Sequence, residues 1–278
     1  MQENYTIRDL IQAGLHLGHK TKKWNPRMKP YIYGSRNDLH IIDLRKTFLL
    51  LKDALEFIKV IAETEGKILF IGTKLQAAEI IKKHALECNQ YYVNKRWLGG
   101  MLTNWSTISN SIDYLNDLDQ ELSKTEVGLK KKEILQMTRQ KSKIEKSLGG
   151  LKNMGDLPQA IFVVDVNKDS LAVSEANKLK IPVIAILDSN SSPIGIDYPI
   201  PGNDDSRKSI ELICSLISKK ISKNFKKKTT DTNKDINNIK GVKIPSKKEV
   251  KQVVSKKKKT NQNTKRNLNV KKKSKKSK

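Results

Sequence analysis

Residues 161–188 have the sequence IFVVDVNKDSLAVSEANKLKIPVIAILD, and this stretch decides the fold. Short runs rich in Val and Ile, at residues 161–164 and 183–187, predict strands that are buried on both faces. Between them, residues 170–179 have the apolar spacing of an amphipathic helix. A strand, a crossover helix and a second strand predict a βαβ unit, and therefore an α/β protein with a parallel sheet.

The same alternation continues on both sides of this unit. Short apolar runs predict three further strands, at residues 39–44, 68–71 and 91–93. Amphipathic spacing predicts three further helices, at residues 47–64, 75–88 and 205 to about 221. Asp204, Asp205 and Ser206 offer N-cap side chains for the last helix. We therefore expect one folded α/β domain over residues 1–225.

Residues 103–152 interrupt this alternation with a longer helical pattern. Apolar side chains recur every three or four residues along two segments, at Trp105, Ile108, Ile112, Leu115, Leu118 and Leu122, and at Ile134, Met137, Ile144, Leu148 and Leu151. The polar stretch 123–132, which contains Gly128, offers a turn between them. The pattern predicts an inserted antiparallel helical hairpin with a coiled-coil-like stripe that packs within the hairpin.

Charge is divided unevenly along the chain. The 278 residues include 55 Lys and Arg and 29 Asp and Glu, a net charge of +26, and residues 219–278 hold 24 of the basic residues but only three of the acids. Residues 226–278 are too polar to bury a core, so we expect a disordered Lys-rich tail. Such a tail is either an electrostatic tether to a polyanion or a drifted extension that a polyanionic partner tolerates.

Several classes of protein are excluded or disfavoured by the sequence. No apolar run approaches the roughly 18 residues of a membrane span. The N-terminal residues MQENYTIRDL resemble neither a secretory signal nor a transit peptide, which favours synthesis and use in one compartment, the cytoplasm. Cys88 and Cys214 lie far apart in apolar segments, a pattern typical of buried free thiols rather than of a disulfide.

Catalytic templates are also missing. The strand at residues 68–71 is followed by GTKLQ, which matches neither the dinucleotide-binding nor the phosphate-loop motif, and the sequence contains no GxSxG motif. We therefore predict a binding protein rather than an enzyme. No cofactor, metal, small-molecule substrate or membrane partner is predicted.

Residues 19–36, HKTKKWNPRMKPYIYGSR, form the richest candidate site. The segment has no acid, and Trp24, Tyr31 and Tyr33 are interleaved with its cations. Cations neutralise phosphates and aromatic rings stack on exposed bases, so nucleic-acid binding is favoured over a merely solvated loop. Pro26 and Pro30 prevent one continuous helix, and we expect a surface loop with a short hairpin.

A second patch, NKRWLGG at residues 94–100, follows the strand predicted at 91–93. The carboxyl ends of strands are where α/β folds bind ligands. Lys95 and Arg96 supply cations, and the paired glycines allow close approach to a phosphate. The alternative interpretation is structural: Trp97 would be a core residue and the glycines would only turn the chain. The sequence does not distinguish this interpretation from phosphate binding.

His16 and His19 form an HxxH pair. On a helical turn this spacing would place both imidazoles on one side, where Asp188, Asp204 or Asp205 could complete a metal site. The favoured alternative is that the histidines pack or form hydrogen bonds near the end of the sheet, since glycines interrupt the segment.

Four longer strings occur in a characteristic order: WNPRMKPYIYGSR at 24–36, RWLGGMLTNW at 96–105, MGDLPQAIFVVD at 154–165 and IPGNDD at 200–205. Together they closely resemble the small ribosomal subunit protein S2 family of the bacterial or organellar type. The resemblance covers residues 5 to about 220. It does not cover the tail, because bacterial members of the family commonly end in a shorter and often acidic extension.

The resemblance implies a flavodoxin-like three-layer α/β domain with a protruding hairpin and no catalytic activity. It implies small-subunit rRNA and other small-subunit proteins as partners, in bacteria including protein S1, at the junction of head and body. The protein would act in the ribosome of a bacterial cytoplasm or of an organelle. The positions that match the family and carry suitable chemistry for RNA contacts are Lys20, Lys22, Lys23, Trp24, Arg27, Lys29, Arg36, Lys74, Lys95, Arg96 and Asn104.

Two alternatives come from other classes. An α/β enzyme that acts on nucleotides and carries a nucleic-acid-binding tail would require a nucleotide loop. A protein held at anionic membranes by its basic tail would require an amphipathic helix or an acylation signal. The sequence contains neither feature.

Overall fold

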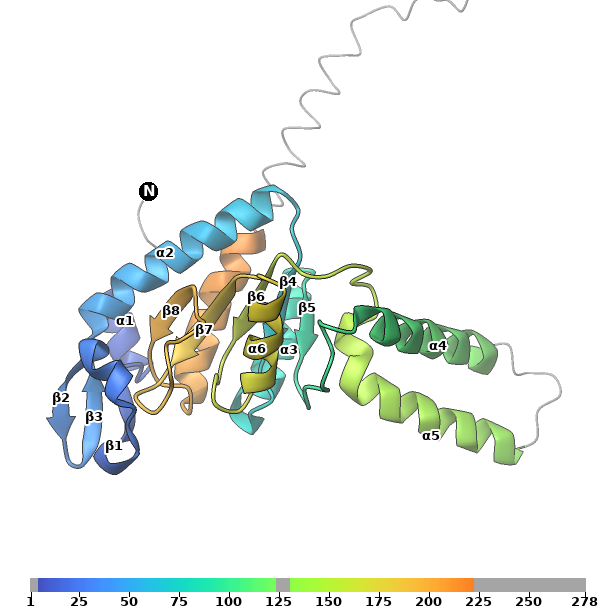
Figure 1. Ribbon diagram of the computed structural model, residues 1–278, viewed down its shortest axis with the longest axis horizontal. Coiled ribbons are helices and arrows are strands. Elements are labelled where there is room, and N and C mark those ends of the chain that lie inside the picture. The colour runs from blue at the N-terminus through green and yellow to red at the C-terminus, as the bar shows by residue number, and fades with distance from the viewer. Residues whose placement is uncertain (1–4, 124–130, 223–278) are drawn as a thin grey trace, which may run out of the picture. The chain divides into compact units, whose positions relative to one another are not determined.

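The computed structural model describes residues 5–123 and 131–222, which belong to one compact unit (Figure 1). The predicted tail at residues 226–278 and the centre of the predicted turn at 124–130 lie outside the described residues. In the described part of the chain, no helix is long and apolar enough to cross a membrane. Cys88 and Cys214 are buried free thiols, as predicted.

The larger sheet has five parallel strands: β4 (Ile68–Ile71), β5 (Tyr91–Val93), β6 (Ala160–Val163), β7 (Val183–Leu187) and β8 (Tyr198–Pro201). Their order across the sheet is β5-β4-β6-β7-β8. Renumbered from one, this is the 2-1-3-4-5 order of flavodoxin-like folds. The predicted parallel α/β sheet is confirmed, and the four strands predicted for it agree with the structure to within one residue.

Strand β8 is the one strand of this sheet that the sequence pattern did not reveal. Its sequence, YPIP, contains Pro199 and Pro201, which lack an N–H and are normally signs against a strand. β8 tolerates them because it lies at the edge of the sheet and pairs only with β7.

Each face of this sheet has its own core. On one face, Phe70 and Phe162 lie under α2 (Leu44–Glu63), α3 (Leu75–Glu87) and the helix formed by residues 207–222. On the other face, Leu69 and Val163 contact α6 (Ser170–Lys178) and the loop after β5. Two helical layers around a sheet buried on both faces explain the continuous apolar runs of the strands.

A second, antiparallel sheet comes from the N-terminal part of the chain, after α1 (Ile7–Gln12). It contains β1 (Leu17–Lys20), β2 (Ile32–Arg36) and β3 (Leu39–Ile42) in the order β1-β3-β2. The strand predicted at 39–44 therefore exists but ends at Ile42, because the Asp43 carboxylate accepts a hydrogen bond from the Arg45 backbone N–H and caps α2.

The last helix spans residues 207–222 and begins two residues later than predicted. Ser206, one of the three predicted N-cap residues, lies at its start, where the Ser206 hydroxyl accepts a weak hydrogen bond from the Ser209 N–H. The Asn203 side chain supports this turn by accepting hydrogen bonds from the next two backbone N–H groups. Asp204 and Asp205 instead form ion pairs with Lys74.

The insertion between β5 and β6 consists of α4 (Trp105–Ser123) and α5 (Lys131–Leu148), which lie side by side (Figure 1). The apolar stripe of α4 is buried as predicted, at Ile108, Ile112, Leu115 and Leu118, whereas the stripe of α5 is mostly half-buried. At the base of α5, a Cβ on Gly150 would overlap the Tyr92 carbonyl oxygen, so only glycine allows this approach to β5.

Candidate nucleic-acid interface

A lysine surrounded by carboxylates lies where the strands of the larger sheet end. Lys74 follows β4, Asp165 follows β6, and Asp204 and Asp205 follow β8. The Lys74 Nζ lies 2.7 Å from Asp204, 2.5 Å from Asp205 and 3.4 Å from Asp165. Only 15% of the Lys74 side chain is exposed, and Asp204 and Asp165 are buried as well, whereas half of the Asp205 side chain reaches solvent.

Burial and the neighbouring charges shift the pKa values of Lys74 and Asp204. Burial alone would lower the pKa of Lys74, but hydrogen bonds to Asp204 and Asp205 raise it, and the ammonium stays charged. Burial raises the pKa of Asp204 to about 7, and the nearby charges of Asp165 and Asp188 act in the same direction. The structure therefore places the predicted RNA contact Lys74 in an internal ion-pair group rather than on an open surface.

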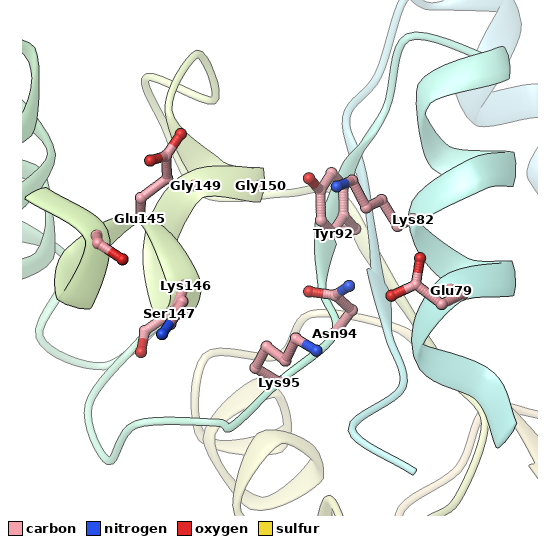
Figure 2. Close-up of a pocket in the computed structure, with 11 residues that line it drawn as sticks. Glu79, Lys82, Tyr92, Asn94, Lys95, Glu145, Lys146, Ser147, Gly149 and Gly150 are labelled. Atoms are coloured by element: carbon pink, nitrogen blue, oxygen red, sulfur yellow. The ribbon is translucent and has the colours of Figure 1, made fainter. Parts of the chain in front are cut away.

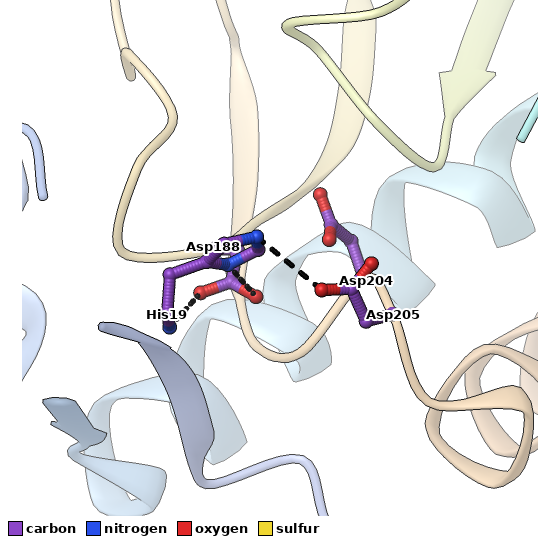
Figure 3. A group of neighbouring side chains, drawn as sticks. All are labelled: His19, Asp188, Asp204 and Asp205. Atoms are coloured by element: carbon purple, nitrogen blue, oxygen red, sulfur yellow. Dashed lines mark hydrogen bonds and ion pairs between the residues drawn. The ribbon is translucent and has the colours of Figure 1, made fainter. Parts of the chain in front are cut away.

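His19 joins this group from the N-terminal sheet (Figure 3). Its Nδ1 lies 2.9 Å from Asp188 and its Nε2 lies 3.3 Å from Asp205. The hydrogen bond to Asp188 raises the pKa of His19. The His19 backbone N–H also donates to the Ser189 hydroxyl at 2.8 Å. These contacts fasten the start of the basic segment to the end of β7.

The helical geometry considered for the HxxH pair is wrong. His19 lies in β1, and His16 precedes that strand, with a buried Nδ1 that has no hydrogen-bond partner among the described residues. The neighbours of His19 are instead three aspartates, and one donor atom from each of these four residues lies within 4.8 Å of the others. Imidazole and carboxylate donors of this kind could hold a divalent cation such as zinc.

The basic segment presents its cations to solvent. All six predicted cations of residues 20–36 are exposed: Lys20, Lys22, Lys23, Arg27, Lys29 and Arg36. Met28, at the centre of the segment, is fully buried and belongs to the core beneath β4 and β6. The Asn25 N–H donates to the Ser189 carbonyl at 2.8 Å. The backbone of the segment is thus anchored to the domain, and its charged side chains are exposed to solvent.

The loop of residues 94–104 is organised by one buried carboxylate from α6. Glu175 is 6% exposed and accepts five hydrogen bonds from the loop, at 2.8 to 3.1 Å. The donors are the Trp97 indole, the Thr103 hydroxyl and the backbone N–H groups of Gly100, Leu102 and Thr103. Burial alone would raise the pKa of Glu175, but these hydrogen bonds outweigh it and lower the pKa.

Trp97 and Gly100 have the structural roles that one interpretation of the second patch gives them. Trp97 is a core residue, 6% exposed. Gly100 turns the chain with a φ of +86°, a conformation that favours glycine. Lys95 and Arg96, however, remain exposed on the same loop. Asn104 is exposed as well, and its side chain accepts hydrogen bonds from Ser106 and Thr107 in the first turn of α4.

Lys95 also lines a cleft of about 310 Å³ between α3, β5 and α5. Figure 2 shows Lys82 and Asn94 on one side of this cleft and Lys146 on the other. Lys82 and Lys146 could not be selected from the sequence, because only the packing of α3 and α5 beside β5 brings them near Lys95. Glu175 could not be selected either, because one acid in an amphipathic helix gives no signal.

The chain matches a known protein family over most of its length. The family model described as "Ribosomal protein S2" matches residues 10–224. "Small ribosomal subunit protein uS2" of Anaplasma marginale is 54% identical over 219 residues, which cover 78% of this chain and 67% of that protein. The proteins of the same name from Ehrlichia ruminantium and Granulibacter bethesdensis are 54% and 52% identical over 217 residues, which cover 76% and 84% of those relatives.

Proposed function

Because the chain belongs to the ribosomal protein S2 family and is a structural, non-enzymatic protein of the small ribosomal subunit, we propose that it binds small-subunit rRNA through two surfaces. The first is the basic segment of residues 20–36, and the second is the loop of residues 94–104. Lys74 is left out of both, since its ammonium is paired with carboxylates.

The observation that carries this proposal is the exposure of every cation of the basic segment on a scaffold held by buried contacts. Residues 19–36 contain no acid that would neutralise them. His19 holds the backbone at the start of the cationic run, and the buried Met28 holds it at the centre. A rigid backbone with solvated ammonium and guanidinium groups suits the phosphates of a folded RNA, which keep a fixed spacing.

Recognition by this surface is expected to depend on RNA shape and phosphate positions. The major groove of an RNA helix is too narrow and deep for side chains to read. Contacts to phosphate fix orientation without reading sequence. We extend the proposal to the finer assignments implied by the family resemblance, which are a place at the junction of head and body and protein S1 as a neighbour.

Sedimentation tests the proposal directly. Lysate from cells that express the tagged protein is separated on a sucrose gradient after a high-salt wash, and each fraction is probed for the tag. Stoichiometric migration with small subunits and intact ribosomes is the expected result. Recovery at the top of the gradient would refute a stable place in the subunit.

Replacing Arg27 and Arg96 together by Ala should weaken binding to small subunits prepared without this protein. Both side chains are exposed, so their loss should leave the fold intact. If each neutralises one phosphate, the slope of log affinity against log salt should fall in magnitude by roughly 1.4 to 1.8. Binding is measured by filter retention over a KCl series.

The matched control replaces Lys178 and Lys219, which are also exposed but belong to neither surface, by Ala. This variant removes the same charge and should leave the salt slope unchanged. Equal slopes for both double variants would mean that charge count alone, and not these two surfaces, governs binding.

A further inference from the structure

Tyr33 is the most exposed aromatic residue of the basic segment. Its side chain lies on β2, one of the two edge strands of the N-terminal sheet, and the residue is 73% exposed. An aromatic ring that stays in water forgoes the free energy of burial. Single exposed apolar residues are common, so exposure alone does not indicate a ligand. The side chains around the ring give the further evidence for one.

An arginine, Arg45, lies over the Tyr33 ring. The Arg45 guanidinium carbon is 5.9 Å from the centroid of Tyr33, a distance typical of a cation–π contact. Arg45 in turn donates two hydrogen bonds to the Asp43 carboxylate, each 3.1 Å long. Such a two-point contact fixes the plane of a guanidinium. Arg45 therefore orients the Tyr33 ring, and Asp43 in turn orients Arg45.

Trp24, the aromatic residue among the predicted RNA contacts, is less suitable for stacking. Trp24 is 37% exposed, and its ring packs against His40 with centroids 5.3 Å apart. Part of the indole surface is thus used for internal packing. Tyr33 offers about twice the exposed fraction.

We propose that Tyr33 is a stacking platform for an unpaired base of RNA, with Arg45 beneath the ring and the cations of residues 20–36 binding the flanking phosphates. This inference rests on the proposed rRNA binding and specifies its ligand as a base in a loop, bulge or single strand. Stacking of a base on an aromatic ring needs no sequence-specific hydrogen bond, and a pre-oriented ring loses little conformational entropy when the base arrives.

The test compares Tyr33→Ala with Tyr33→Phe in binding to small subunits prepared without this protein. Loss of one stacked base should weaken the affinity of the Ala variant roughly ten- to a hundred-fold. The Phe variant keeps the ring and should bind within about twofold of the parent. Because stacking releases no counterions, the salt slope should be the same for all three proteins.

Tyr114→Ala is the matched control, since Tyr114 is a 46% exposed tyrosine on α4, outside the basic segment; its binding should be unchanged. Photo-crosslinking to rRNA substituted with 5-iodouridine gives a second readout, and an adduct on Tyr33 is expected. Parental affinity of Tyr33→Ala would overturn the stacking proposal alone if the Arg27 and Arg96 double variant still binds weakly. If that variant also binds normally, the rRNA-binding surface itself is refuted.

Discussion

Replacing Glu175 by Gln is expected to lower the free energy of unfolding by about 3 kcal/mol at neutral pH. The Gln side chain has nearly the same shape, but it turns one acceptor oxygen into an NH₂ group that faces N–H donors of the loop. At least two of the five donors would lose their partner, and an unsatisfied buried donor, such as the Trp97 indole or the Leu102 N–H, costs about 1–3 kcal/mol. Urea denaturation with linear extrapolation measures the loss.

The pH dependence of this loss follows from the lowered pKa of Glu175. A carboxyl whose pKa is lower in the folded protein stabilises it above the unfolded value, about 4.5, and this stabilisation disappears as the pH falls through the folded value. The difference between the parent and Glu175→Gln should therefore be largest at neutral pH and shrink below about pH 4.5. A protonated Glu175 resembles the amide in having a donor where the loop needs an acceptor.

The same substitution should also weaken binding to small subunits, because the loop that presents Lys95 and Arg96 would lose its organising contact. Glu56→Gln is the matched control, since Glu56 is an exposed acid on α2, and it should change neither stability nor binding. Full stability of Glu175→Gln would mean that the loop is held by the packing of Trp97 alone. Weak binding with full stability would indicate that Glu175 acts on the RNA surface and not through the loop.

The parallel sheet could be predicted from the sequence because its strands are buried on both faces. Runs such as residues 183–187 then consist of consecutive apolar residues. This signal can be recognised without knowing which elements pack against the strand. Strand β8 lacks this signal, because an edge strand can include Pro199 and Pro201. Strands β1 and β2 of the small antiparallel sheet lack it too, since none of their four or five residues is fully buried.

The candidate site was predictable only where its residues are neighbours in the sequence. The cations of residues 20–36 form a run, so their composition reveals them. Glu175 and the loop of residues 94–104 are more than 70 residues apart, and only packing of α6 against that loop joins them. A sequence does not show whether a lysine is exposed or is buried in an ion pair. The sequence alone therefore could not separate Lys74 from the exposed cations.

Lys74 is the second residue whose replacement should strongly destabilise the folded protein. Lys74→Met should lower the free energy of unfolding by about 3–5 kcal/mol at neutral pH, because removing one partner of a buried ion pair leaves its carboxylates uncompensated. The Met side chain fills most of the same space but supplies no charge for Asp204 and Asp205. Lys83→Met is the matched control: Lys83 also pairs with an acid, Glu211, but both side chains are exposed, and exposed pairs stabilise little.

A double variant separates this internal role from a contact with RNA. Asp204→Asn removes one of the carboxylates that Lys74 neutralises, so Lys74→Met and Asp204→Asn together should cost less than the sum of the single variants. For the fraction of Lys74→Met that remains folded, the salt slope of binding to small subunits should equal that of the parent. A slope reduced by about 0.7 to 0.9, with additive stability effects, would instead show that Lys74 leaves the carboxylates and neutralises a phosphate in the complex.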